Sequence, residues 1–356
     1  MNRDTLSTFL ERGFYGVVVG VVYAWINLKG GIELFLICMT IGFSIGFFTG
    51  LLERGLHMTR LRRQQFLVVL FVRSLANLAV IVLSILLVLG AYRMISGNID
   101  LTTIRMQLIG WVRDGNFVYV VFYALVVLVL LQFITLVSRL LGPKMLINYL
   151  VGRYHTPQEE DRIFMFMDLR ASTTIAERLG HLKWHQFLND FFFDIGRPIR
   201  RAKGEVYQYV GDEVVISWPA KVGAKNLNCI HCFFWIWHKM YQRREYYLKK
   251  YGYEPVFKAG YHVGKVIVGE IGDYTRDIVF HGDTVNTASR IQMECNVWNR
   301  RLLLSDTLLN RLELGKEYTS EYITNIRLRG KNEELGLYSL DPVKPIPMPT
   351  PVAPEE

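Results

Sequence analysis

Long apolar segments with almost no charge occupy the first 142 residues of this chain, and after them charge and polarity return to the values of a globular protein. A helix needs about 20 residues of this kind to cross a bilayer. Four segments approach or exceed that length, and the first is the shortest: residues 13–28, 31–52, 66–92 and 117–141. The sequence therefore predicts an α-helical transmembrane bundle of four helices over residues 1–142.

The first apolar segment has a second interpretation, because a cleaved signal peptide is also short, apolar and close to the amino terminus. Asp4, Glu11 and Arg12 precede it, however, and no small-residue cleavage site follows before Lys29. We therefore expect an uncleaved membrane anchor.

Basic residues are distributed unevenly between the loops. The link between the second and third segments carries Arg54, Arg60, Arg62 and Arg63, whereas the first link carries Lys29 and Glu33. The positive-inside rule places the basic loop in the cytoplasm. The amino terminus and everything after the fourth segment are then cytoplasmic, and the loop over residues 93–116 is outside. This predicts a multi-pass protein of the cell (inner) membrane.

The net charge of +9 is compatible with that arrangement. Many basic residues lie next to the apolar segments, where anionic lipid head groups are their natural partners. We accordingly expect the lipid bilayer as a partner and do not expect nucleic acid. The four cysteines show neither a disulfide framework nor the paired spacing of a zinc site.

A strand ending in a carboxylate opens the second half of the chain. Residues 143–160 are expected to form a cytoplasmic coupling helix that ends near Pro157, because proline disfavours helix in the residue before it. The apolar run over residues 162–167 then predicts a buried strand that ends at Asp168. Small polar residues follow, and apolar residues at helical spacing continue from Ile175 to about residue 201, with one interruption near Gly180.

This strand, loop and helix would direct backbone N–H groups and a positive helix end toward an anion. A phosphate group could therefore bind just above Asp168. The alternative is that Asp168 only caps the helix.

A second aspartate lies at the tip of a predicted hairpin. Residues 204–218 alternate on both sides of Gly211-Asp212, which is typical of two strands joined by a tight turn. If the hairpin neighbours the first strand, Asp168 and Asp212 converge, and two carboxylates beside a phosphate cradle suit Mg²⁺ or Mn²⁺. The alternative for Asp212 alone is an ordinary turn residue.

The remaining segments complete an α+β pattern. We expect a helix over about residues 225–251, whose Cys229, His231, Cys232 and His238 fill the core and do not bind metal. Residues 256–271 predict two strands separated by a turn near residues 262–264. Residues 277–290 predict a strand, a turn and a helix on which Asn286 and Arg290 share a face. Edge strands follow over residues 302–340, and residues 342–356 form a proline-rich disordered tail.

The order of these elements resembles the class III adenylyl and guanylyl cyclase domain over residues 161–341. Four separate motifs carry the resemblance: Phe166-Met-Asp168 with Ser-Thr-Thr, Tyr209-Val-Gly-Asp212, Gly260-Tyr-His-Val-Gly264 with Val268-Gly269, and Gly282-Asp-Thr-Val-Asn286-Thr-Ala-Ser-Arg290. The resemblance implies an α+β ferredoxin-like class III nucleotidyl cyclase domain, and the whole chain is similar to membrane-anchored bacterial-type adenylate cyclases.

The resemblance also implies roles for individual residues. Two Mg²⁺ or Mn²⁺ ions would be bound at Asp168, Leu169 and Asp212. The substrate-binding positions would be Leu169, Arg170, Ala171, Ser172 and Thr173 in the loop, with Gln208 and Val279 at the purine. The catalytic positions would be Asn286, Arg290 and Arg329. Arg329 stands where the family usually has lysine, which keeps the charge and alters the geometry.

The implied activity is the conversion of ATP to cyclic AMP and pyrophosphate by a homodimer with two shared sites. Gln208 and Val279 depart from the usual purine-reading pair, and glutamine can pair with adenine or with guanine. A guanylyl cyclase and a catalytically weak, cyclase-like membrane receptor are therefore the alternatives.

Overall fold

The computed structural model divides the chain into two compact units, Met1–Leu141 and Gly142–Glu356. It describes residues 3–26, 32–57, 66–95, 110, 115–141, 147–148, 151–274, 276–327 and 334–343. Most of the predicted basic loop, the middle of the predicted outer loop, Arg329 and residues 344–356 of the predicted tail lie outside these ranges.

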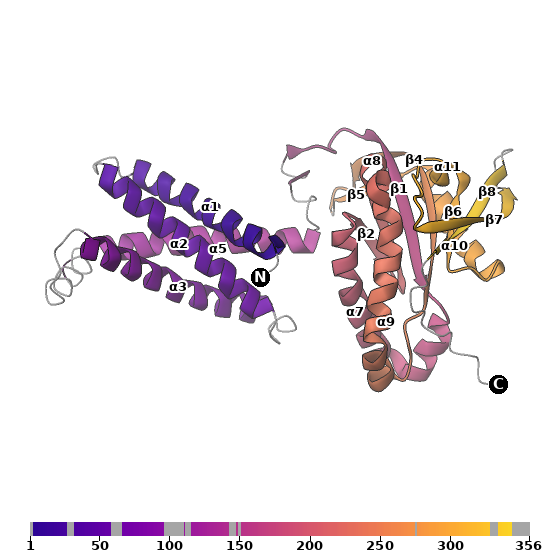
Figure 1. Cartoon of the computed structure of the whole chain (residues 1–356), viewed down its shortest axis with the longest axis horizontal. Coiled ribbons are helices and arrows are strands. Elements are labelled where there is room, and N and C mark those ends of the chain that lie inside the picture. Colours follow the sequence, from indigo (N-terminus) through magenta and orange to yellow (C-terminus); the bar gives the residue numbers. More distant parts are fainter. Residues whose placement is uncertain are drawn as a thin grey trace. The chain divides into compact units, whose positions relative to one another are not determined.

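Long helices form the described part of the first unit (Figure 1). They are α1 (Arg3–Ile26), α2 (Ile32–His57), α3 (Phe66–Ile95) and α5 (Asn116–Leu141). Two stretches are long and apolar enough to cross a membrane, Phe35–Leu52 in α2 and Phe71–Tyr92 in α3, whereas the apolar parts Gly13–Ile26 and Val121–Thr135 are shorter. The structure therefore supports two candidate spans among the described residues, and four spans remain a prediction.

Helices α1 and α2 approach each other closely at glycines. A Cβ atom added to Gly16 would lie 2.0 Å from the carbonyl oxygen of Gly42, and one added to Gly42 would lie 2.2 Å from that of Gly16. Small residues allow two helix backbones to come this close. These glycines are therefore used for packing between α1 and α2 within this unit.

A mixed sheet is the centre of the second unit. Its strand order is β2-β3-β1-β4-β6-β8-β7, and β5 pairs with β4. All described pairings are antiparallel except that of β4 with β6. The strands are β1 (Gln158–Leu169), β2 (Glu205–Val210), β3 (Glu213–Pro219), β4 (Phe257–Ile271), β5 (Asp277–His281), β6 (Leu302–Ser305), β7 (Tyr318–Arg327) and β8 (Glu334–Pro342).

Helices cover both faces of this sheet, and the long ones are α7 (Ser172–Arg201), α9 (Asn228–Tyr251) and α10 (Asp283–Val297). Short helices are α8 (Ala220–Ala224), η2 (Lys225–Leu227) and α11 (Asp306–Leu309). Strand β1 shows the division: Met165 and Met167 pack in the core with α7 and α9, whereas Phe164 and Phe166 pack in a second cluster with α10. Successive strand residues point to opposite faces, so Asp168 belongs to the α10 face.

Buried carboxylates join α7 to α9, which Figure 1 shows side by side. Asp190 accepts hydrogen bonds from Tyr246 (2.6 Å), Lys250 (2.7 Å) and Tyr251 (2.7 Å). Burial alone would raise the pKa of Asp190, but these bonds and the Lys250 charge outweigh it, so the pKa is lowered. The carboxylate therefore stays charged and holds the two helices together.

Two details of the sequence interpretation meet different outcomes. The break predicted near Gly180, in the helix that follows β1, is confirmed, because Gly180 has a non-helical conformation within α7 (φ 73°, ψ 161°). The predicted turn near residues 262–264 is wrong, since β4 pairs continuously with β1 across that region. Gly264 and the nearby Gly260 allow α10 to approach: a Cβ on Gly260 would lie 2.2 Å from the backbone nitrogen of Gln292, and one on Gly264 would lie 2.5 Å from Oγ1 of Thr284.

The segment before β1 also differs in detail from the prediction. Residues 152–155 form turns and the strand begins at Gln158, which lies inside the predicted coupling segment 143–160. Tyr154 from this segment is only 5% exposed and packs in the cluster on the α10 face. The last residues before the strand are therefore part of the second unit's core.

Candidate active site

Asp168 and Asp212 lie at the same end of the sheet. Strand β1 pairs with β3 as far as Met167 opposite Val214, so Asp168 follows this pair and Asp212 precedes it in the β2–β3 turn. Gly211, with φ of 61°, makes that turn tight. The structure thus brings together the two aspartates that are 44 positions apart in the sequence.

The Asp168 carboxyl group has a raised pKa. Its pKa is raised to about 6: burial makes the largest contribution, the adjacent Asp212 carboxylate adds to the rise, and Lys258 opposes it. Lys258, itself 7% exposed, places Nζ 3.3 Å from Oδ2 of Asp168, and Gln292 of α10 donates to the same oxygen at 3.2 Å. Burial also raises the pKa of Glu213 to about 7, with further contributions from Asp168 and Asp212.

The single positive charge of Lys258 does not balance the three acidic groups Asp168, Asp212 and Glu213. Oδ2 of Asp212 is buried and has no hydrogen-bond partner, which is a costly condition for a polar atom. Leu169 is only 3% exposed in the core, so only its backbone could contribute a ligand. Among the described residues no group of three or more His, Cys, Asp or Glu side chains could hold a metal ion. A pair of carboxylates with an orphaned oxygen nevertheless suits a hard divalent cation that keeps other oxygen ligands.

A cavity of about 330 Å³ opens beside these carboxylates. It is lined by Asp168, Leu169, Arg170, Ala171, Ser172, Thr173, Lys258, Asn296 and Asn299. The five predicted loop residues 169–173 are therefore all at one cavity. Ala171 adopts a left-handed conformation (φ 54°), and no side chain caps the start of α7. The first N–H groups of α7 are consequently without a side-chain cap at the end of the helix that attracts anions.

Arg170 supports this loop from the side. Its Nη2 donates to the carbonyl of Arg300 at 2.7 Å, and its Nη1 donates to Oδ1 of Asn299 at 3.3 Å. Its backbone N–H donates to the carbonyl of Val256 at 2.7 Å. Arg170 therefore ties the loop to the segment after α10.

The other predicted residues have different surroundings. Gln208 is exposed on β2 opposite Val215, and Val279 is half-buried on β5 opposite Gly269. Asn286 is exposed and Arg290 half-buried on α10, whereas the contact of this helix with Asp168 is made by Gln292 from its buried side. Arg329 lies outside the described residues.

Sequence reasoning missed the cavity residues Lys258, Asn296 and Asn299. It also missed Gln292 and Glu213, which lie near the two aspartates. Lys258 had a weak signal, because it interrupts an apolar stretch of β4 and lies on the face opposite the buried Phe257 and Ala259. Its position opposite Asp168 depends on the register of two strands that are distant in the sequence.

Comparison with known proteins finds a matching family and curated relatives. A model of the family described as the adenylate and guanylate cyclase catalytic domain matches residues 155–341. The chain is 35% identical over 221 residues to adenylate cyclase 2 of Rhizobium meliloti (strain 1021), covering 62% of this chain and 61% of that protein. It is 26% identical over 183 residues to an adenylate cyclase of Anabaena cylindrica, covering 49% and 36%. The chain thus matches less than two thirds of these relatives.

A solved structure shows the same fold. The structure of a bacterial light-regulated adenylyl cyclase aligns with a TM-score of 0.50 and 24% identity, covering 60% of this chain and 62% of that one.

The raised pKa values predict how stability depends on pH in a metal-free sample. Asp168 and Glu213 bind protons more tightly in the folded state than their usual values allow, so ionising them destabilises the fold as pH rises from about 4 to about 7. The replacement Asp168→Asn removes one negative charge and reduces the repulsion on the neighbouring carboxyl groups of Asp212 and Glu213. With a chelator at pH 8, calorimetry should show the variant melting roughly 3–6 °C above wild type.

At pH 4 the same difference should vanish, because the wild-type carboxyl groups are then protonated. Asp273→Asn in the exposed loop before β5 is the matched control and should change little at either pH. An equal Asp168→Asn effect at both pH values would contradict the electrostatic explanation.

Proposed function

The chain belongs to the adenylate and guanylate cyclase catalytic-domain family, and from this premise we propose that it converts ATP to 3′,5′-cyclic AMP and pyrophosphate. The observation that carries the proposal is the convergence of Asp168 and Asp212 beside the cavity lined by residues 169–173. Cyclisation needs a ribose 3′-hydroxyl group to attack the α-phosphate, and this arrangement provides carboxylates and an anion cradle side by side.

Mg²⁺ or Mn²⁺ would be held by Asp168 and Asp212, with the backbone of Leu169 as a further ligand. When bound, two such ions polarise the attacking hydroxyl group and neutralise charge on the phosphates. The like charges of the two carboxylates and the unpartnered oxygen of Asp212 support this assignment.

The chain's own groups would position the triphosphate. The N–H groups at the start of α7 lie in the loop of Ala171, Ser172 and Thr173 and would donate to phosphate oxygens. Lys258 lines the same cavity and brings a buried positive charge to it. We therefore assign Lys258 to phosphate binding in addition to its contact with Asp168.

The catalytic Asn286 and Arg290 would act across a homodimer. They lie on one side of α10, at positions whose helical spacing continues through Met293 and Val297, which are 61% and 72% exposed. A face that combines two polar groups with exposed apolar side chains suits burial against a second copy. In this arrangement Asn286 orients the ribose, Arg290 stabilises charge on the α-phosphate, and each of two shared sites takes its aspartates from the other protomer.

ATP is the preferred substrate in this proposal, because the curated relatives above are named adenylate cyclases. Gln208 and Val279 would contact the purine. Since a glutamine amide offers both a donor and an acceptor, the substrate GTP is the second candidate, and a catalytically weak, cyclase-like membrane receptor is the third.

We further propose that the first unit anchors the enzyme in the cell membrane, with the catalytic unit in the cytoplasm. Large apolar side chains are widely exposed on its helices, including Phe71 (70%), Leu83 (65%) and Phe122 (64%). Exposed apolar surface of this extent is unusual for a soluble protein. The bilayer would cover it.

The activity is tested by incubating the detergent-purified full chain with Mn²⁺ and either ATP or GTP. We expect cyclic AMP as the main product, and we expect Asp212→Asn to reduce its formation to background because the metal pair is broken. Asp273→Asn should retain wild-type rates. A wild-type chain that forms neither cyclic nucleotide would favour the receptor, and one that forms mainly cyclic GMP would reassign the substrate.

Shared sites predict complementation between inactive variants. Asp168→Ala and Asn286→Ala should each be inactive as homodimers, whereas their mixture should recover activity, since one of the two sites in a mixed dimer then contains every group. Mixing Asp168→Ala with Asp212→Ala is the control and should recover nothing, because both defects lie in the same half-site. Recovery in the control, or none in the first mixture, would contradict the shared site.

The membrane proposal predicts fractionation behaviour. The full chain should stay in the membrane pellet after extraction with alkaline carbonate and should be released by detergent, because apolar burial is insensitive to charge. A soluble cytoplasmic protein expressed in the same cells is the control. Release by carbonate alone would show that the first unit is not embedded.

A further inference from the structure

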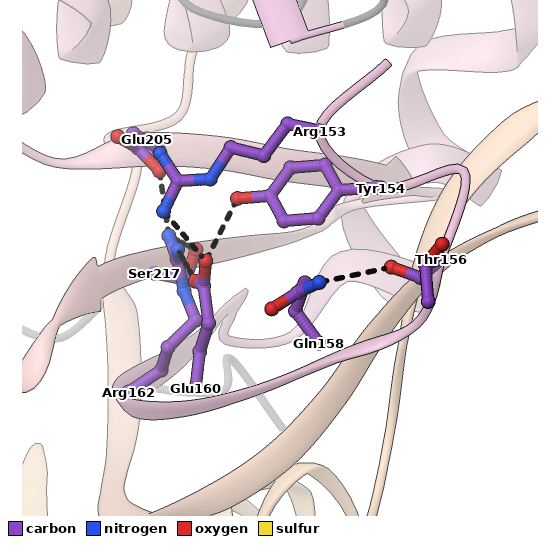
Figure 2. A network of polar contacts seen from close by, with 8 residues as sticks. All are labelled: Arg153, Tyr154, Thr156, Gln158, Glu160, Arg162, Glu205 and Ser217. Carbon is purple, nitrogen blue, oxygen red and sulfur yellow. Dashed lines mark hydrogen bonds and ion pairs between the residues drawn. The ribbon is translucent and has the colours of Figure 1, made fainter.

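A nearly buried arginine connects several strands of the catalytic unit. Arg162 of β1 is 3% exposed, and its guanidinium donates to Glu160 at 2.9 Å, to Glu205 of β2 at 2.5 Å and to Ser217 of β3 at 2.9 Å (Figure 2). The same group lies 4.8 Å from the ring centre of Phe280 on β5. One side chain therefore contacts β2, β3 and β5 from β1.

These strands carry the metal and purine positions proposed above. Asp168 lies on β1, on the same face as Arg162 and six residues further along. Asp212 lies in the turn between β2 and β3, Gln208 lies on β2, and Val279 is the neighbour of Phe280 on β5. No element of this group can change its position relative to β1 without altering a contact of Arg162.

The network also reaches the segment before β1. Glu160 accepts hydrogen bonds through Oε1 from Tyr154 at 2.9 Å and from Arg153 at 3.2 Å, while its Oε2 faces Arg162 (Figure 2). The carbonyl of Tyr154 accepts a bond from the backbone of Glu270 on β4 at 3.1 Å. The two oxygens of one carboxylate thus join the incoming segment to the buried arginine.

We propose that Arg162 is a positioning residue for the metal and purine sites, and that Glu160 makes this positioning depend on Arg153 and Tyr154. The inference rests on the proposed function and deepens it, because it identifies the contacts through which the segment entering the catalytic unit sets the geometry of the site. Arg162 lies about 20 Å from Asp168 along an extended strand and acts through the strands alone.

The first experiment measures Mn²⁺ binding, which needs no turnover. Free Mn²⁺ is followed by electron paramagnetic resonance as it is titrated with the full chain in detergent, for wild type, Arg162→Met and Arg162→Lys. Groups that hydrogen-bond directly to a metal ligand typically change affinity about 10–100-fold. Arg162 acts from further away, so we expect Arg162→Met to weaken Mn²⁺ binding about tenfold, the lower end of that range. Arg162→Lys retains the charge with fewer donors and should fall between Arg162→Met and wild type.

Lys265→Gln is the matched control. It removes an ion pair of β1 with β4, in which Nζ of Lys265 lies 2.7 Å from Glu159, but that pair is exposed and does not involve β2, β3 or β5. It should bind Mn²⁺ as wild type does. If Arg162→Met has the wild-type circular dichroism spectrum and binds Mn²⁺ within about twofold of wild type, the proposal is wrong.

The second experiment keeps the proposal testable if Arg162→Met does not fold. Tyr154→Phe removes only the hydroxyl group that donates to Glu160 and preserves the buried ring. Hydrogen–deuterium exchange should then increase in residues 205–219, which form the β2–β3 hairpin, and stay unchanged in α9. An increase confined to residues 151–160 would show a local role and overturn the coupling.

A failure of this proposal can be distinguished from a failure of the proposed cyclase activity. Metal binding and exchange are measured without substrate, so they remain informative if the wild-type chain forms no cyclic nucleotide. If it does, Arg162→Lys should also change the ratio of KM for ATP to KM for GTP, which a loss of stability alone would not move.

Discussion

The repulsion between Asp168 and Asp212 is the constraint around which the catalytic unit is built. Burial raises the pKa of Asp168, and the like charge of the adjacent Asp212 adds to the rise. Only a rigid scaffold keeps such a pair together. Strand β1 has hydrogen-bonded neighbours on both sides, and Lys258 and Gln292 hold the Asp168 carboxylate from β4 and α10. The two carboxylates can therefore attract a cation, because the surrounding groups of the fold do not balance their charge.

The alternation of side chains along β1 explains how one strand serves both the core and the site. Met165, Met167 and Leu169 face α7 and α9 and supply apolar burial, while Phe164, Phe166 and Asp168 face the α10 side. A register shift of one residue would exchange these sets and bury the carboxylate in the apolar core. The requirement for burial therefore fixes the direction in which the Asp168 carboxylate points.

Much of the site was predictable because its signals are local in the sequence. Asp168 ends an apolar run, Asp212 occupies a hairpin tip, and Gly180 interrupts a helical pattern. The errors arise where tertiary packing decides. A turn was expected near Gly264, yet this residue lies in a continuous strand. Gly264 and Gly260 are glycines because α10 passes too close for a Cβ atom. Lys258 was missed since its place beside Asp168 depends on pairing between residues 90 positions apart, which periodicity cannot reveal.

The buried ion network at Arg162 is not explained by stability alone. Removing a guanidinium and carboxylates from water is costly, and well-packed apolar residues of similar volume often give equal or greater stability. Such a network fixes the relative positions of the strands. Arg162 must bond to Glu160, Glu205 and Ser217 at the same time, so only one arrangement of β1, β2 and β3 satisfies all three contacts. Apolar packing would tolerate small shifts of these strands. Such shifts would change the distance between Asp168 and Asp212, which the strands must hold together against their repulsion. A polar anchor on the same face as Asp168 is therefore the arrangement expected where the relative position of strands matters more than their total burial.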